Sequence, residues 1–139
     1  MDKGTNIDSQ AGVTIHRDLQ SYASVRSRWA LAGADKDWLC ALCHHRLASD
    51  RDRLQFGNRS EFAFTNPDGM PFLIVTFSEA TGCLDAGDAT LEHTWFPGHA
   101  WSYCLCGHCG QHLGWFYTGS DEFVGLIQTK IIRALNLFN

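Results

Sequence analysis

Alternating and compact apolar runs make up much of the chain from residue 61 onward. Glu61–Thr65 reads Glu-Phe-Ala-Phe-Thr, with phenylalanine at every second position, as in a strand that buries one face. The next four residues, Asn66-Pro67-Asp68-Gly69, are a strong turn signal, and Pro71–Phe77 is a short, mostly apolar run. We therefore expect two antiparallel strands joined by a tight turn.

Tryptophan and tyrosine alternate in two later segments. Trp101 and Tyr103 lie two positions apart, as do Trp115 and Tyr117, so each pair shares one face of a predicted strand. A Cys-x-x-Cys motif lies between these two strands. The aromatic and sulfur chemistry of the chain is thus concentrated in its last third.

Other segments give weaker signals. Residues 44–57 are charged and mixed, which predicts a loop with a short strand at most. Residues 81–90 contain two glycines and two aspartates and are predicted as a loop, after which residues 91–95 resume an extended pattern. The mixed β-branched content of residues 123–135 favours strand over helix.

The start of the chain is predicted to be an extension to the main domain. Residues 1–12 are polar and small, with no periodicity, and are expected to be disordered. His16–Ala32 has a partial helical period, which predicts a short covering helix. We expect a partly disordered, helical or irregular extension over residues 1–35 and one domain over residues 36–139.

Composition narrows the class of protein. Of the 139 residues, 45% are hydrophobic and only 19% are charged, which is typical of a globular chain. With 11 basic and 15 acidic residues the net charge is -4, so nucleic acid is an unexpected partner. No apolar run approaches the roughly 20 residues of a membrane span, and the polar start is unlike a secretory signal. We expect no membrane partner and a cytoplasmic location.

Two Cys-x-x-Cys pairs predict a metal site. Cys40 and Cys43 form the first pair, and Cys106 and Cys109 form the second. Four thiolates complete the tetrahedral shell of a structural zinc ion, and 62 residues separate the pairs, too many for one compact finger. We expect one Zn²⁺ per chain that pins together two turns of a β fold, with no catalytic role because the shell is closed.

Other possible ligands lie nearby. Cys104 precedes Cys106 by two positions and offers a competing pair, while Cys83 stands apart from both pairs. We interpret Cys83 and Cys104 as small buried apolar residues, as free cysteine commonly is. Three histidines could replace a thiolate ligand, namely His44, His45 and His108.

An ordered set of motifs resembles the thalidomide-binding domain of cereblon, also called the CULT domain. The set comprises the first Cys-x-x-Cys, the Asn-Pro-Asp-Gly turn, the stretch Glu-His-Thr-Trp-Phe-Pro-Gly-His-Ala-Trp at residues 92–101, the second Cys-x-x-Cys and Gly-Trp-Phe-Tyr at residues 114–117. The resemblance covers roughly residues 38 to 135. It implies an all-β fold, a β-tent of two antiparallel sheets pinned by a structural zinc.

The resemblance also implies a ligand site. The family's three-tryptophan cage falls on Trp95, Trp101 and Trp115, with Tyr117 where an aromatic residue completes the pocket. A cyclic imide would bond to the backbone of the His-Thr-Trp stretch, that is, to the His93 carbonyl and the Trp95 N–H, with Thr94 in place of the family's serine. The loop beside the opening would contain Asn66, Pro67 and Phe72.

The expected function is therefore a binding module without catalytic residues. Its ligand would be a cyclic imide of the glutarimide or thalidomide type, a uracil-like ring or a cyclised peptide end. The resemblance does not extend to the segments by which cereblon docks to a ubiquitin ligase, so we expect no adaptor role, as in single-domain bacterial members.

Two alternatives remain at this stage. The paired Cys-x-x-Cys turns also resemble zinc-containing methionine sulfoxide reductases, although no cysteine follows Cys109 to serve as the nucleophile. Aromatic cages also hold methylammonium ions, for which Glu92 is the nearest carboxylate.

Overall fold

A computed structural model describes residues 36–137, so the predicted N-terminal extension and its helix lie outside the described residues. The described strands are β1 (Asp37–Cys40), β2 (Arg46–Ser49), β3 (Glu61–Thr65), β4 (Pro71–Phe77), β5 (Cys83–Thr90), β6 (Ala100–Cys106), β7 (His112–Thr118), β8 (Glu122–Ile127) and β9 (Ile131–Arg133). Short 3₁₀ helices follow some of them, namely η3 (Asp50–Asp52), η4 (Gln128–Lys130) and η5 (Ala134–Leu137). The prediction of an all-β fold is confirmed.

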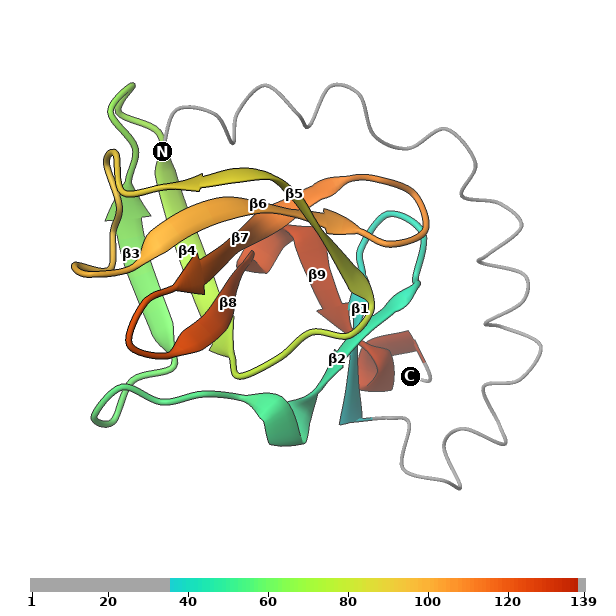
Figure 1. Cartoon of the computed structure of the whole chain (residues 1–139). Helices are drawn as coiled ribbons and strands as arrows, with labels where there is room; N and C mark the ends of the chain where they lie inside the picture. Colours follow the sequence, from blue (N-terminus) through green and yellow to red (C-terminus); the bar gives the residue numbers. More distant parts are fainter. Residues whose placement is uncertain (1–35, 138–139) are drawn as a thin grey trace.

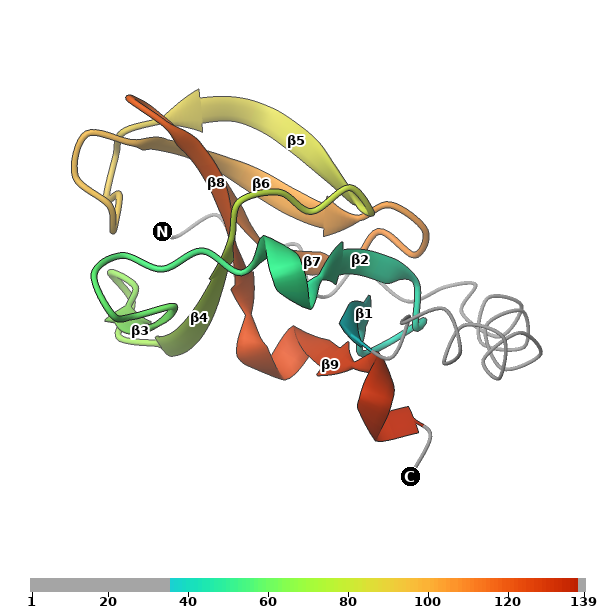
Figure 2. The same cartoon turned by 90° about the horizontal axis from the view of Figure 1, so that it is seen from below.

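The strands form two antiparallel sheets. The smaller sheet has the order β2-β1-β9, and the larger has the order β3-β4-β8-β7-β6-β5. The chain passes from the larger sheet to the smaller through η4, between β8 and β9, as Figures 1 and 2 show. The two-sheet architecture expected from the resemblance is thus present in the described residues.

The predicted hairpin is confirmed. β3 and β4 pair from Glu61 opposite Val75 to Thr65 opposite Pro71. Gly69, in the connecting turn, has a φ of 85°, a left-handed conformation that glycine adopts without strain. The turn signal in the sequence therefore reflects a real conformational requirement.

Three sequence-based assignments need correction. Residues 81–90 were predicted as a loop but contain β5, which pairs with β6 along the edge of the large sheet. Residues 91–95 were predicted to be extended but form turns. The segment 123–135 is not one strand, because η4 divides it into β8 and β9.

The large sheet separates two groups of core residues. Trp115 and Tyr117 belong to an aromatic cluster with Trp101 and Phe123. Phe116, which lies between them on β7, packs instead against the core that contains the cysteines and Leu113. The alternation predicted for this strand is confirmed, and it places aromatic chemistry on one face and sulfur chemistry on the other.

Candidate functional site: a cysteine cluster and an aromatic cluster

Four cysteine sulfurs converge where turns from the two sheets meet. Cys40 ends β1 and Cys43 lies in the turn after it, while Cys106 ends β6 and Cys109 lies in the following turn. The four Sγ atoms all lie within 4.8 Å of one another. The Sγ atoms of Cys40 and Cys109 are 3.8 Å apart, and those of Cys43 and Cys106 are 3.6 Å apart.

These spacings fit a structural metal site. A tetrahedral ion with metal–sulfur bonds of about 2.3 Å holds its sulfurs about 3.8 Å apart, whereas a disulfide requires about 2.05 Å. The structure thus brings together the four residues whose spacing predicted ligands. Such an ion would join the β1–β2 turn of the small sheet to the β6–β7 turn of the large one.

The thiols of Cys40, Cys43 and Cys106 hold their protons with different strengths. The hydrogen bond to Cys106 raises the pKa of Cys40 to about 12, and a bond to the same partner raises the pKa of Cys43. Hydrogen bonds from Cys40 and Cys43 lower the pKa of Cys106, whose sulfur also accepts from the His108 N–H at 3.4 Å. Cys106 is therefore the thiol of these three that loses its proton most readily.

The other sulfur and imidazole groups are placed differently. His45 and His108 stack on each other, with ring centroids 5.8 Å apart. Cys104 is buried, as predicted, and burial raises the pKa of its thiol. Cys83 is only half-buried, so the prediction of a buried residue was wrong there, because β5 is an edge strand.

The predicted cage tryptophans all belong to the aromatic cluster. Trp101 and Trp115 are buried, and Trp95 packs against the cluster with partial exposure. The rings of Trp95 and Trp115 are nearly perpendicular, at 81°, with centroids 5.1 Å apart. Phe72 stands edge-on to Trp115 at 5.5 Å.

Two aromatic neighbours were missed by the sequence reasoning. Phe64 stacks on Trp95 with centroids 4.9 Å apart and planes at 11°. Phe96 packs against the ring of Tyr117 at 4.7 Å. The inward position of Phe64 in the alternating strand and the place of Phe96 within the quoted motif were the available signals.

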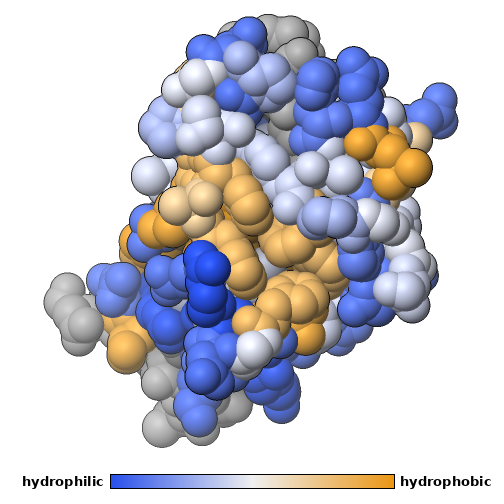
Figure 3. Space-filling view, turned by 90° about the vertical axis from the view of Figure 1, so that its left-hand side faces the viewer, coloured by the Kyte–Doolittle hydropathy of each residue, from blue (hydrophilic) through white to orange (hydrophobic). Residues whose placement is uncertain are grey.

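Figure 3 shows the side of the molecule where β3 and the loop before β6 lie. Apolar side chains gather at the centre of this face, with hydrophilic ones around them. The half-buried residues of the aromatic cluster include Phe64, Phe72 and Trp95, which come from β3, β4 and the 91–99 loop. The cluster therefore reaches the surface where these three elements meet.

The 91–99 loop carries the polar groups of the predicted site and is held by hydrogen bonds. Trp101 Nε1 donates to the Glu92 carbonyl at 2.7 Å, and Thr94 Oγ1 donates to the His99 carbonyl at 2.7 Å. His93 has a φ of 58°, a left-handed conformation uncommon outside glycine. Within residues 36–137, the His93 carbonyl and the Trp95 N–H form no hydrogen bond with the rest of the chain.

The turn beside the cluster is organised by Asn66. Its Oδ1 accepts from the Asp68 N–H at 3.0 Å and the Met70 N–H at 2.8 Å, while its buried Nδ2 has no partner among the described residues. Pro67 in the same turn is exposed. The indole Nε1 of Trp95 donates to the Thr65 carbonyl at 3.3 Å, which ties the 91–99 loop to this hairpin.

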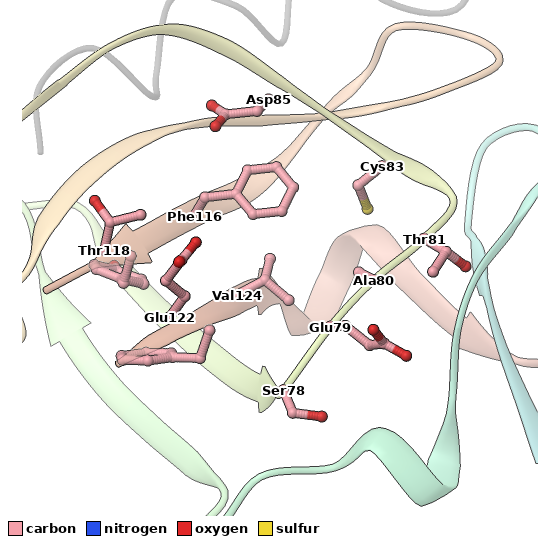
Figure 4. A pocket seen from close by; sticks show the side chains of 12 residues that line it. Ser78, Glu79, Ala80, Thr81, Cys83, Asp85, Phe116, Thr118, Glu122 and Val124 are labelled. Carbon is pink, nitrogen blue, oxygen red and sulfur yellow. The ribbon is translucent and has the colours of Figure 1, made fainter. Parts of the chain in front are cut away.

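A separate cavity of about 360 Å³ lies on the other face of the large sheet (Figure 4). Phe116 and Val124, which pair across β7 and β8, form part of its wall, and Glu122 and Asp85 lie around it. None of the three predicted cage tryptophans lines it. Tyr117 and Phe123 of the aromatic cluster also line it, so the cavity adjoins the cluster without reaching the three tryptophans.

Fold and site together define a β domain with two antiparallel sheets, an aromatic cluster on the larger sheet and a four-cysteine cluster that could hold a metal ion. No family model matches the chain. Among curated proteins, "Protein cereblon" of Gallus gallus is 33% identical over 79 residues, or 52% of this chain and 18% of the relative. "Protein cereblon" of Xenopus tropicalis is 38% identical over 75 residues, which are 50% of this chain and 17% of the relative.

A third relative, "Protein cereblon" of Danio rerio, is 34% identical over 79 residues, or 52% of this chain and 18% of the relative. The chain contains a cereblon-like domain of the CULT type, as the motifs predicted. It spans less than a fifth of the length of these relatives. Residues 36–137 include no helix with the length and hydropathy of a membrane span.

Proposed function

We propose that this chain is a non-catalytic binding domain that holds cyclic imides in its aromatic cluster. The observation that carries the proposal is a pair of backbone groups, the His93 carbonyl and the Trp95 N–H, that have no hydrogen-bond partner within residues 36–137. Both groups lie in the 91–99 loop, and the ring of Trp95 contacts the buried Trp115. Apolar walls with a few fixed polar groups are typical of small-molecule sites.

The chemistry of an imide matches this pair of groups. Its N–H can donate to the His93 carbonyl, and an adjacent carbonyl can accept from the Trp95 N–H. Trp115 Nε1 is buried and has no partner in the described chain, so it offers a further donor. A buried donor without an acceptor is costly, and a ligand oxygen would relieve that cost.

The rigidity of the loop supports the same reading. Thr94 and Trp101 bond to backbone carbonyls of the loop, and His93 is held in a left-handed conformation. Backbone strain of this kind persists only where the surroundings impose it, and it is concentrated at ligand sites. A preordered loop loses little entropy when a small ring binds.

Size sets the expected affinity and the range of ligands. Glutarimide has about eight heavy atoms, so ligand efficiencies of about 0.3 to 1.5 kcal/mol per atom bracket very weak to nanomolar binding, with micromolar in the middle. Uracil-like rings and cyclised peptide ends present a similar acceptor–donor–acceptor edge.

We propose zinc as the ion of the cysteine cluster, with a structural role only.

A ligand panel tests the proposal. Tryptophan fluorescence or ligand-observed NMR would compare glutarimide, uridine, methionine sulfoxide and trimethyllysine. We expect saturable binding of glutarimide, weakened in Trp95→Ala and unchanged in Leu84→Ala, since Leu84 is an exposed β5 residue outside the cluster. Preference for trimethyllysine would indicate a methylammonium cage. Reduction of methionine sulfoxide to methionine, in samples supplied with a thiol reductant, would indicate an enzyme.

A further inference from the structure

The 91–99 loop is fastened to the β7–β8 turn through one side chain, His99. Its Nδ1 lies 3.2 Å from the Pro97 carbonyl, and its Nε2 forms a short contact with the Asp121 carboxylate. The imidazole also packs edge-on against Phe123 of β8, with ring centroids 5.3 Å apart. Its side chain is only 15% exposed.

The approach of the two segments depends on a glycine. A Cβ added at Gly119 would lie 2.5 Å from the Gly98 carbonyl oxygen and 2.9 Å from the His99 ring. Real Cβ atoms essentially never come so close, so the turn reaches the imidazole only because residue 119 has no side chain. The same turn is closed by the Gly119 N–H, which donates to the Asp121 carbonyl at 2.9 Å.

Both nitrogens of His99 face oxygen acceptors. A neutral imidazole carries one N–H and can satisfy one of them, whereas the imidazolium carries two and can donate to both. We propose that His99 is a positioning residue of the ligand site, whose imidazolium clamps the 91–99 loop to the β7–β8 turn. This inference rests on the proposed function, because the loop supplies the His93 and Trp95 backbone groups to the ligand.

The surroundings of the ring favour the charged form. Asp121 faces it from the β7–β8 turn, Phe123 from β8 and the Pro97 carbonyl from its own loop, and Asp121 is the charged side chain with which it pairs in the described part of the chain. The hydrogen bond to Asp121 raises the pKa of His99, while burial opposes the shift.

The sign of the pH effect follows from the raised pKa. A group whose pKa is higher in the folded protein stabilises it fully below the ordinary pKa of about 6.5, and this contribution is lost as the pH rises through the folded value. The clamp is therefore complete below the ordinary imidazole pKa of about 6.5 and loses one hydrogen bond as the pH rises through the raised pKa of His99. Ligand affinity should fall in the same window.

The effect on the ligand is modest and measurable. When the imidazolium loses its proton, one of its two hydrogen bonds disappears. Loss of one such bond changes an equilibrium constant by about 2- to 13-fold. We expect the dissociation constant for glutarimide to rise by a factor in this range between about pH 6 and about pH 9. Glutarimide itself does not titrate there.

Three variants test the clamp against a simple structural role. Asp121→Asn keeps the size of the side chain and removes the charge, so the midpoint of the pH profile should move down. His99→Phe keeps the ring contact with Phe123 and should bind more weakly, with a flat profile. Glu122→Gln removes the adjacent carboxylate, which forms no ion pair in the described structure, and should match the wild type.

The experiment is a calorimetric titration with glutarimide across this pH range, with the His99 imidazole followed by NMR in the same samples. An imidazole pKa above the ordinary value, lowered in Asp121→Asn and aligned with the affinity profile, is the expected result. If the wild type binds glutarimide saturably but its affinity does not change with pH, the role of His99 is overturned while the proposed function stands. Absence of binding at every pH would overturn the proposed function and this role with it.

Discussion

Removing one sulfur from the four-cysteine cluster should cost the domain its fold. We choose Cys43→Ala, because Cys43 is fully buried and its Sγ lies 3.6 Å from that of Cys106. A three-sulfur remnant leaves the fourth position of the tetrahedral shell without a thiolate, and alanine also leaves a small void in the core. The matched control is Cys83→Ala, which removes a half-buried thiol outside the cluster.

The size of the effect follows from what the ion would contribute. Structural zinc in peptide models binds with about 10–16 kcal/mol of apparent free energy, as much as the whole net stability of about 5–15 kcal/mol of a typical domain. Weakening the site by even half of that amount would leave the folded state of this chain marginal. We expect folding to depend on the ion, because the cluster joins turns from two different sheets.

The assay combines metal analysis with thermal unfolding. We expect one zinc ion per wild-type chain, a cooperative transition, and loss of both in Cys43→Ala or on treatment with a chelator. Cys83→Ala should keep the metal and most of the stability. Retention of stoichiometric metal by Cys43→Ala, or its release from Cys83→Ala, would refute the ligand assignment.

Three further outcomes are expected. Gly114→Ala should destabilise the fold by about 1–3 kcal/mol or more, because the new Cβ would lie 2.0 Å from the Gly125 carbonyl oxygen. An unchanged melting temperature would contradict this close packing. Acidification should release the metal, because thiolate is the ligating form of cysteine. A metal-binding dye would record the release, and retention of the metal at low pH would argue against thiolate ligands such as Cys40. Thr94→Val should weaken glutarimide binding by about 2- to 13-fold, since it removes the bond to the His99 carbonyl, and calorimetry of a folded variant would test this.

Local sequence signals predicted the elements that have a strong pattern of their own. The alternation of Glu61–Thr65 and the Asn-Pro-Asp-Gly turn predicted β3, β4 and their connection correctly. The Cys-x-x-Cys spacing predicted which sulfurs converge. In both cases the chemistry that forms the structure lies within a few neighbouring residues.

Edge strand β5 could not be predicted in this way. Leu84 is exposed and Gly87 has a φ of 84°, so the strand lacks a buried face with a clean period of two. Its register also shifts between Ala86 and Thr90. The strand forms because β6 offers it a pairing partner, a tertiary cause that the local pattern does not contain.

Contacts between distant segments were also invisible in the sequence. His99 and Asp121 are 22 residues apart and belong to two separate turns. Nothing in either local segment indicates the other. The motif therefore predicts the residues of the candidate site one by one, whereas the contact between His99 and Asp121 is visible only in the structure.

The most direct test of the binding account compares glutarimide with N-methylglutarimide. If the imide N–H donates to the His93 carbonyl, methylation removes the donor and places a methyl group against the backbone. An unmade buried hydrogen bond costs about 1–3 kcal/mol and the steric displacement adds to it, so affinity should fall by roughly 10-fold to more than 100-fold. Equal affinities for the two compounds would contradict the proposed polar edge and the binding mode built on it.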